Sequence, residues 1–423
     1  MELSPRAGEK ISQLLAKGVN IPNPLTLDIG DEVDLDLISA TGVTIYPGCR
    51  IYGDQTVISK GVSLGKEAPV TIDNCQLGAQ VDLKGGYFRK SVFLAKANMG
   101  SGAQVREACL LEEEANGAHC VGLKQTILFP FVTLGSLINF CDCFMAGGSS
   151  RKDHSEVGSS YIHFNFTPDG DKATASLFGD VPRGVMLKQP RIFLGGQGGA
   201  VGPVVCGYGN VVAAGSILRR SHPNDNQLIF GKTHGAMAID YVPSMYPNFD
   251  RLLENNLLFL GNLTALEQWY IHVRQLFFAD MEFGRRLYDG ALGVLATAKT
   301  ERIKRLRVLA EKAFQSARSR AMPEQAVAGR RDLYDHLDEL TALFTNGDGA
   351  RYGHHARDRF VEHLLSIRQT SPTDYIAFIQ SLPADVAALG TEWLMEIVNT
   401  LNQKAVELLP SIELFIKSLD DLT

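Results

Sequence analysis

The sequence predicts a left-handed parallel β-helix of hexapeptide repeats followed by an all-helical C-terminal domain. An aliphatic residue followed by Gly or another small residue recurs at spacings near six between about residues 38 and 221. Fixed short periods of this kind indicate a solenoid. The composition changes from Gly, Val and Ile in this segment to Leu, Ala, Glu and Arg after about residue 245, which favours helices there. Asn-Gly and Asp-Gly hairpin signals are nearly absent, which argues against an antiparallel sandwich.

Each repeat predicts a short strand and a tight turn. The aliphatic side chain points into a narrow interior, and the small residue permits a turn with positive φ. Successive coils then pair in parallel, so that each coil buries the next. The phrases that carry the period include Gly61-Val62-Ser63-Leu64-Gly65, Ala97-Asn98-Met99-Gly100, Thr133-Leu134-Gly135 and Val211-Val212-Ala213-Ala214-Gly215.

These signals divide the chain into four segments. We expect a lead-in over residues 1–37, the β-helix over 38–221, a linker over 222–247 and a helical bundle over 248–423. Thr264-Ala265-Leu266-Glu267 has the pattern of a capping box and predicts a helix start. The repeats are interrupted between about residues 151 and 191 by polar, turn-rich sequence, and loops that leave a rigid scaffold often contact ligands.

The overall composition excludes several classes of protein. A net charge of -6 gives no basic surface for nucleic acid or an anionic membrane, and no apolar run is long enough to span a bilayer. The seven cysteines form no C-x-x-C pair, so we expect neither a disulfide framework nor a metal site. This pattern and the absence of a signal-like N-terminus predict a cytoplasmic protein.

One stretch carries a more specific resemblance. Asn165-Phe166, Gly170 and Lys172 follow a Gly-containing coil, and Phe193-Leu194-Gly195-Gly196 and Ala213-Ala214-Gly215 come later. This order resembles the acetyltransferase arm of the bacterial bifunctional glucosamine-1-phosphate acetyltransferase / N-acetylglucosamine-1-phosphate uridyltransferase. Fewer than 40 residues precede the repeats, without a Gly-rich nucleotide-binding loop, and we therefore expect no uridylyl transfer by this chain alone.

The resemblance implies which residues bind which ligand. It assigns acetyl-CoA, as a co-substrate, to Asn165, Phe166, Ala213 and Ala214. It assigns the phosphate of a sugar phosphate or sugar nucleotide to Arg106 and Lys172, and we include Lys124 among the substrate-binding candidates. An Arg fork together with a Lys is also the ordinary clamp for a phosphate dianion. Gly195 and Gly196 either let a pantetheine arm approach the backbone or simply form a tight solenoid turn.

The family's general base is a His that follows an aliphatic-Gly coil, and this sequence departs from that pattern. A match back from Gly158 places Asp142 there, whereas a match forward from Lys124 places Ser136 there. A base that titrates near neutral pH favours His. His154 is therefore the first candidate. His163 is the second, on the expectation that it faces outward with Asn165. Asp142 would orient such a His or act as the base itself.

The sequence thus predicts an acyl-CoA-dependent transferase acting on an amino-sugar phosphate or sugar nucleotide. The resemblance further implies a homotrimer. One alternative is a non-catalytic scaffold that binds a sugar nucleotide or acyl-CoA, which the missing family His favours. Another is a protein related to sugar-1-phosphate nucleotidyltransferases that needs a partner domain.

Overall fold

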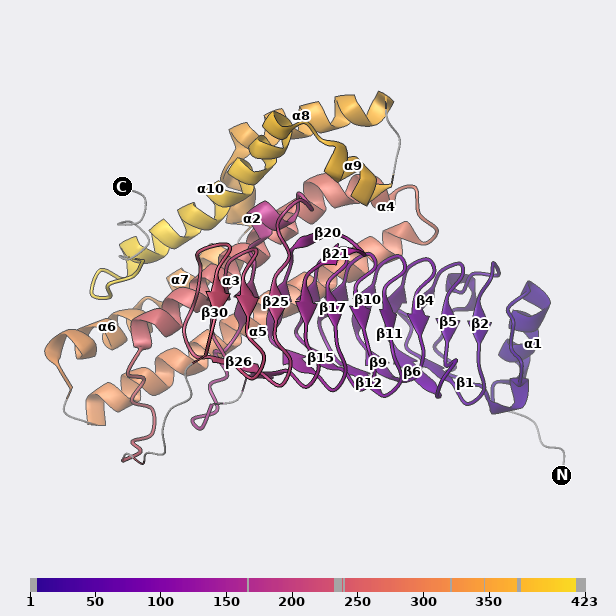
Figure 1. Ribbon diagram of the computed structural model, residues 1–423, viewed down its shortest axis with the longest axis horizontal. Coiled ribbons are helices and arrows are strands. Elements are labelled where there is room, and N and C mark those ends of the chain that lie inside the picture. The colour runs from indigo at the N-terminus through magenta and orange to yellow at the C-terminus, as the bar shows by residue number, and fades with distance from the viewer. Residues whose placement is uncertain are drawn as a thin grey trace.

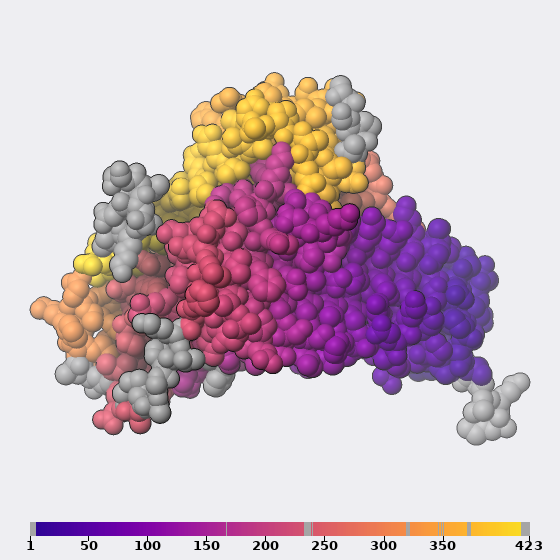
Figure 2. Space-filling model, viewed as in Figure 1, coloured from indigo at the N-terminus to yellow at the C-terminus, as the bar shows by residue number. Residues whose placement is uncertain are grey.

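A computed structural model describes residues 6–165, 167–231, 238, 240–319, 322–345, 347–370 and 374–415. It shows a left-handed parallel β-solenoid of about 11 turns with a helical C-terminal region lying along one side (Figure 1). Both parts of the predicted fold class are thereby confirmed. The N-terminal coils project beyond the helical region (Figure 2).

The solenoid is a prism with three parallel sheets. Sheet A contains β2 (Thr44–Ile45), β5 (Ser63–Leu64), β8 (Asp82–Leu83), β11 (Asn98–Met99), β14 (Asn116–Gly117), β17 (Thr133–Leu134), β22 (Glu156–Val157), β25 (Phe193–Leu194), β28 (Val211–Val212) and β30 (Leu228–Ile229). Sheet B contains β1 (Asp28–Ile29), β3 (Arg50–Tyr52), β6 (Val70–Asp73), β9 (Gly86–Arg89), β12 (Ala103–Val105), β15 (Gly122–Lys124), β18 (Asn139–Cys141), β23 (Ile162–Phe164), β26 (Gly199–Val201) and β29 (Ile217–Leu218). Sheet C contains β4 (Val57–Ile58), β7 (Gln76–Leu77), β10 (Ser91–Phe93), β13 (Cys109–Leu111), β16 (Ile127–Leu128), β19 (Cys143–Met145), β24 (Ser176–Phe178) and β27 (Val205–Cys206).

The turns that join these sheets form three edges, which we call the A/B, B/C and C/A edges. A small hairpin of β20 (Gly148–Ser150) and β21 (Asp153–His154) and the short helix α2 (Val181–Gly184) leave the C/A edge. The strands run past both ends of the expected range 38–221, since β1 precedes it and β30 follows it. Helix α1 (Gly8–Lys17) and the 3-10 turns Pro24–Thr26 and Leu35–Leu37 lie before or between the first strands.

The helical region begins with α3 (Phe249–Trp269), which continues through a π-helical turn (Tyr270–Arg274) into α4 (Gln275–Phe278). The other elements are α5 (Gly284–Ser319), α6 (Glu324–Asp335), α7 (Leu337–Thr345), a 3-10 turn (Asp348–Arg351), α8 (His354–Thr370), α9 (Tyr375–Ser381) and α10 (Ala384–Leu408). The expected helix start at Thr264 is wrong. Thr264 lies inside α3, where its hydroxyl donates to the carbonyl of Leu260 instead of capping a helix.

The outward faces of sheets A and C differ in chemistry. Along sheet A, the outward row is polar through the first seven strands: Thr44, Ser63, Asp82, Asn98, Asn116, Thr133 and Glu156. Along sheet C, the corresponding row is almost entirely apolar and fully buried: Val57, Val92, Leu110, Ile127, Phe144 and Leu177. Sheet C therefore needs a cover, because a strand with both faces apolar is buried on both sides.

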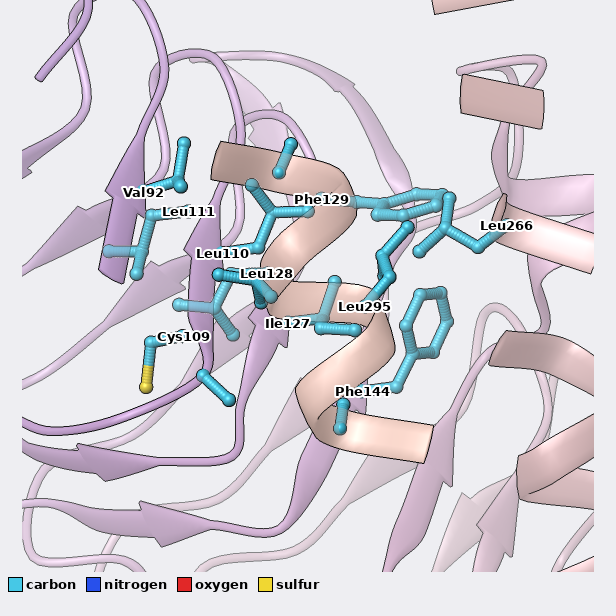
Figure 3. Packing of buried hydrophobic residues seen from close by; sticks show 14 of the residues in the cluster. Val92, Cys109, Leu110, Leu111, Ile127, Leu128, Phe129, Phe144, Leu266 and Leu295 are labelled. Atoms are coloured by element: carbon cyan, nitrogen blue, oxygen red, sulfur yellow. The ribbon is translucent and has the colours of Figure 1, made fainter. Parts of the chain in front are cut away.

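Helices α3 and α5 provide that cover. Leu266 of α3 and Leu295 of α5 lie among Leu110, Ile127 and Phe144 (Figure 3). Each large aliphatic side chain buried in this way contributes about 1.5–3 kcal/mol. The two halves thus share one hydrophobic core. No helix of the described residues is long and apolar enough to cross a membrane.

A buried polar cluster lies in this interface at the C/A edge. The hydroxyl of Tyr270 donates to Glu112 at 2.6 Å, and the guanidinium of Arg274 donates to Glu113 at 2.7 Å. The Arg274 guanidinium also lies 3.7 Å from the ring centre of Tyr375, and its side chain has no exposed surface. Burial raises the pKa of the Glu112 carboxyl to about 7, although the charge of Arg274 opposes that rise.

The raised pKa of Glu112 predicts a pH-dependent stability. Between its ordinary value of 4.5 and about 7, the folded protein binds a proton that the unfolded chain releases, so stability falls as pH rises through this window. We expect Glu112→Gln to flatten that fall and to leave the protein more stable than wild type at pH 8. Urea unfolding at pH 5, 6, 7 and 8 measures the effect. Glu114→Gln, two positions further along the same turn, is the control, and equal slopes for wild type and Glu112→Gln would contradict the assignment.

Candidate functional site

The residues singled out from the sequence lie in four places on the solenoid. Gly195, Gly196, Ala213 and Ala214 belong to the A/B edge. Asp142, Asn165 and Lys172 belong to the B/C edge, with Arg106 and Lys124 beside it on sheet B. His154 lies in the hairpin at the C/A edge, and His163 points into the interior.

The A/B edge is a stack of turns that the helical region leaves uncovered. The residue with positive φ in each successive turn is Cys120, Leu137, Ser160, Gln197 and Gly215. Gly195 packs directly on the next turn, because a Cβ added there would lie 2.4 Å from the backbone nitrogen of Ala214. Gly196 accepts a hydrogen bond from the amide of Gly215. The glycine run is therefore a tight solenoid turn in direct contact with Ala213 and Ala214.

A His–Ser pair lies on this same edge. His119 Nδ1 is 2.8 Å from Ser136 Oγ, one coil further along, and both residues lie in A/B turns. The amide of Ser136 donates to Ser159 Oγ at 3.2 Å in the following turn. The side chain of His119 is exposed, and its Nε2 makes no hydrogen bond within the described part of the chain. In the tautomer in which Nδ1–H donates to Ser136 Oγ, Nε2 is the nitrogen that can accept a proton from a ligand.

The B/C edge holds a buried bridge between the two halves of the protein. Arg302 of α5 donates to Asp142 Oδ1 at 2.6 Å, and the side-chain amide of Asn165 donates to Asp142 Oδ2 at 2.9 Å. The side chains of Asp142 and Arg302 are only 8% and 4% exposed. Both carboxylate oxygens of Asp142 are thus occupied, and this residue joins α5 to the strand end that precedes Lys172.

The loop that carries Lys172 is held from the helical side. Arg302 reaches the carbonyl of Lys172 at 3.5 Å, and Asn256 of α3 donates to the carbonyl of Ala173 at 3.0 Å. The hydroxyl of Tyr246 donates to Asp171 at 3.1 Å, and the ammonium of Lys312 donates to the carbonyl of Asp169. This excursion of the solenoid is therefore fixed by α3, α5 and the segment before α3. Phe166 lies outside the described residues.

The phosphate candidates lie in a basic row on sheet B. Strand register places Arg89, Arg106 and Lys124 on neighbouring coils of the outward face. Glu107 lies 3.7 Å from Arg89 and 3.6 Å from Lys124 and balances part of this charge. The side chain of Arg106 makes no ion pair within the described ranges, so Arg106 is the least compensated cation of the row.

The expectation that His163 faces outward is wrong. Strand β23 alternates in the opposite sense, so Ile162 and Phe164 are 41% and 40% exposed whereas His163 is 1% exposed. Inside the coil, His163 Nε2 is hydrogen-bonded to Ser176 Oγ at 2.7 Å, and burial lowers the pKa of the imidazole to about 4. A neutral, enclosed imidazole is not placed to take a proton from a ligand outside the solenoid.

His154 is placed differently. Its Nδ1 lies 2.9 Å from the carbonyl of Arg151 in the β20–β21 hairpin, and its Nε2 lies 3.9 Å from Glu156. The side chain is 20% exposed. The hairpin is in turn bound to the helical region, because Gln380 donates to the carbonyl of Ser149 at 2.7 Å. His154 therefore lies on a different edge from the glycine turns.

Thiol chemistry at Cys141 and metal binding are considered next. Cys141 follows Lys124 in the outward row of sheet B, and burial raises the pKa of its thiol to about 12, which disfavours a thiolate nucleophile. Among the described residues, no group of three or more His, Cys, Asp or Glu side chains is arranged to hold a metal ion.

His119 was not predicted, although the sequence carries a usable signal. One turn of the solenoid here is 17 residues, since Asn116 pairs with Thr133. The match forward from Lys124 places Ser136 at the position of the family's His. Counting one 17-residue turn back from Ser136 leads to His119. Coil length was not known from the sequence with that accuracy, because the repeat spacing varies along the chain.

Comparison with known proteins supports the resemblance over about half of the chain. The chain is 26% identical over 212 residues to the Bifunctional protein GlmU of Staphylococcus haemolyticus, which is 50% of this chain and 42% of that protein. It is 28% identical over 217 residues to the Bifunctional protein GlmU of Trichormus variabilis, or 51% of this chain and 43% of that protein. The chain thus spans less than half the length of these relatives. The expected resemblance is confirmed to that extent.

Two further comparisons add little. No family model matches the chain. Among solved structures, the UDP-N-acetylglucosamine acyltransferase from Campylobacter jejuni is similar to 48% of this chain and 66% of its own, with 13% identity and a TM-score of 0.15. A TM-score this low carries no argument about the fold or the site.

The buried bridge at the B/C edge predicts a stability effect. Asp142→Ala leaves Arg302 buried without its partner, and we expect the free energy of unfolding to fall by about 3 kcal/mol. Amides of residues 167–175 should also exchange with solvent faster. Urea titration and hydrogen-exchange mass spectrometry measure the two effects. Asp31→Ala, on the surface, should change stability by less than about 0.5 kcal/mol; equal behaviour of the two variants would refute the bridge.

Proposed function

We propose that the protein transfers an acyl group from acyl-CoA to the amine of an amino-sugar phosphate or sugar nucleotide, with the chemistry at the A/B edge. The observation that carries this proposal is the exposed His119–Ser136 pair on the same stack of turns as Gly195, Gly196, Ala213 and Ala214. The similarity to GlmU over the solenoid supports it.

The residues of this edge suit that chemistry. An amine that attacks a thioester must lose a proton as the new amide bond forms and the carbon–sulfur bond breaks. Imidazole is the side chain suited to accept a proton near neutral pH. The hydroxyl of Ser136 fixes the ring of His119 through Nδ1, which leaves Nε2 for the amine. The expelled coenzyme A thiolate is then protonated from the imidazolium or from water.

The other predicted residues take supporting roles in this proposal. Ala213 and Ala214 present a flat backbone beside the glycine turn, on which an extended pantetheine arm can lie. Arg106 and Lys124 offer positive charge to the acceptor's phosphate from sheet B. Asn165 and Lys172 lie at the opposite side of sheet B. Any contact of Asn165 with acyl-CoA, or of Lys172 with the phosphate, depends on the loop that Arg302 holds.

A homotrimer would complete such a site. The last coils expose apolar residues on both free sheets: Phe193, Val211 and Leu228 on sheet A, and Ile162, Phe164 and Ile217 on sheet B. Earlier positions in the same rows are polar, such as Thr133 and Asn139. Exposed apolar patches mark interaction surfaces. Sheet A of one copy against sheet B of the next is a head-to-tail contact that closes into a ring and encloses the A/B edge.

Turnover measurements on a His119 variant test the proposed general base. We expect His119→Gln to lower the turnover of acetyl-CoA with an amino-sugar phosphate at least a hundredfold while the affinity for acetyl-CoA stays within about threefold, because a general base acts in the chemical step. Calorimetry measures binding and thiol release measures turnover. His154→Gln, on another edge, is the matched control.

The outcomes of that experiment distinguish acyl transfer at the A/B edge from acyl transfer at the C/A edge and from a binding scaffold. Loss of turnover in His154→Gln but not in His119→Gln would place the chemistry at the C/A edge. Binding of acetyl-CoA without turnover with any amino-sugar phosphate would favour a binding scaffold. No binding at millimolar acetyl-CoA would contradict the acyltransferase proposal.

The proposed trimer makes a separate prediction. Replacing Phe193 and Val211 together by Asp places charges in the apolar surface, and we expect the protein to become monomeric while keeping its circular dichroism. Light scattering after gel filtration measures the mass. Thr133→Asp, in the polar part of the same outward row, should leave the trimer intact. A wild-type protein that is already monomeric would refute this arrangement.

A further inference from the structure

A groove separates the N-terminal half of α5 from the B/C edge of the solenoid. It has a volume of about 670 Å³. The solenoid wall includes Asp54, Lys90 and Glu107, and the α5 wall includes Arg286, Asp289 and Gly293. A cleft of this size is typical of small-molecule sites, which often lie between domains. The groove is distinct from the A/B edge, where the proposed acyl transfer takes place.

Some of the charges in the groove are already paired. Glu107 contacts Arg89 and Lys124, and Asp289 accepts a 2.8 Å hydrogen bond from Arg285. The side chains of Lys90, Arg286 and Asp54 make no hydrogen bond or ion pair within the described part of the chain. Two uncompensated cations, one from each wall, and one uncompensated carboxylate therefore face the groove.

The rest of the lining selects the kind of ligand. Within the described part of the chain, no aromatic residue lines the groove, and the largest apolar side chain there is Val294. A nucleobase would find no ring to stack on, and a fatty acyl chain would find little apolar surface. The amide side chain of Gln55, which makes no hydrogen bond within the described ranges, instead offers a donor and an acceptor to hydroxyl groups. The amide side chains of Asn74 and Gln76 are already hydrogen-bonded to Asp73 and to the backbone of Gln55.

The α5 wall of the groove leaves open space at Gly293. A Cβ added at Gly293 would meet no atom within 4 Å, so the space beside this residue is open. Gly inside a helix is destabilising relative to Ala. At Gly290, by contrast, an added Cβ would lie 2.5 Å from the side chain of Gln76, so here α5 approaches the solenoid closely. The two glycines give the helix one contact point and one open pocket beside it.

We propose that this groove binds a phosphorylated amino sugar between the two halves of the protein, at a site separate from the site of acyl transfer. Lys90 and Arg286 bind the phosphate from opposite walls, Asp54 binds the amine, and the amide side chain of Gln55 binds a hydroxyl group. A ligand held in this way crosslinks α5 to the solenoid and stabilises the folded protein in proportion to its concentration.

Calorimetry on the full chain with glucosamine 6-phosphate tests the proposal. We expect Lys90→Gln combined with Arg286→Gln to weaken binding at least about tenfold, because each replacement removes a charge-assisted contact with the phosphate. Arg50→Gln, which removes a positive charge from the outward face of sheet B outside the groove lining, should leave this binding within about twofold. Binding that is lost in Arg106→Gln and kept in the double variant belongs to the acyl acceptor and overturns the groove.

Two further experiments test the open space beside Gly293 and the role of the ligand's amine. Gly293→Leu extends a side chain into the open space and should abolish binding, whereas Gly293→Ala should keep it. Glucose 6-phosphate should bind about fivefold or more weakly than glucosamine 6-phosphate to the wild type, and equally to Asp54→Asn. No binding of glucosamine 6-phosphate at millimolar concentration, with each variant folded by circular dichroism, would overturn the proposal, whatever the outcome of the acyl-transfer assay.

Discussion

The docking of the helical half onto sheet C is the contact on which the rest of the structure depends. A three-sided solenoid whose third face is an apolar row would expose that row to water if α3 and α5 were absent. The apolar contact is non-directional, so the buried pairs Glu113–Arg274 and Asp142–Arg302 fix its register. A buried charge left without its partner is costly, and a shifted register would separate both pairs at once.

This docking determines which edges of the solenoid are bound by helical residues and which edge stays open to solvent. The B/C and C/A edges carry the loop around Lys172 and the hairpin around His154, and both are bound by helical residues such as Arg302 and Gln380. The A/B edge, opposite sheet C, keeps its turns open to solvent. There the His119–Ser136 pair lies on the same stack as the glycine turn, with the Ser159 turn between them. In the proposed trimer, a neighbouring copy would complete the site on this free edge.

The sequence predicts this fold well and its site only in part. A short period with small turn residues determines the solenoid, because only stacked coils satisfy it. The partner of sheet C could also have been inferred, since Ser91-Val92-Phe93 and Cys109-Leu110-Leu111 lack the polar alternation of a solvent-exposed strand. Side-chain direction at His163 and the proximity of His119 to Ser136 depend on the phase and length of individual coils, which a varying repeat does not fix. The pairing of Asp142 with Arg302 spans 160 positions and leaves no local signal.

The most direct test of this account is urea unfolding monitored by two signals at once. The two tryptophans, Trp269 and Trp393, both lie in the helical half, so their fluorescence reports on that half alone, whereas far-ultraviolet circular dichroism reports on the whole chain. If the shared core holds the two halves together, the two transitions coincide in midpoint and slope. A fluorescence transition that is complete while the solenoid's dichroism persists would show that the halves fold independently and would contradict the account.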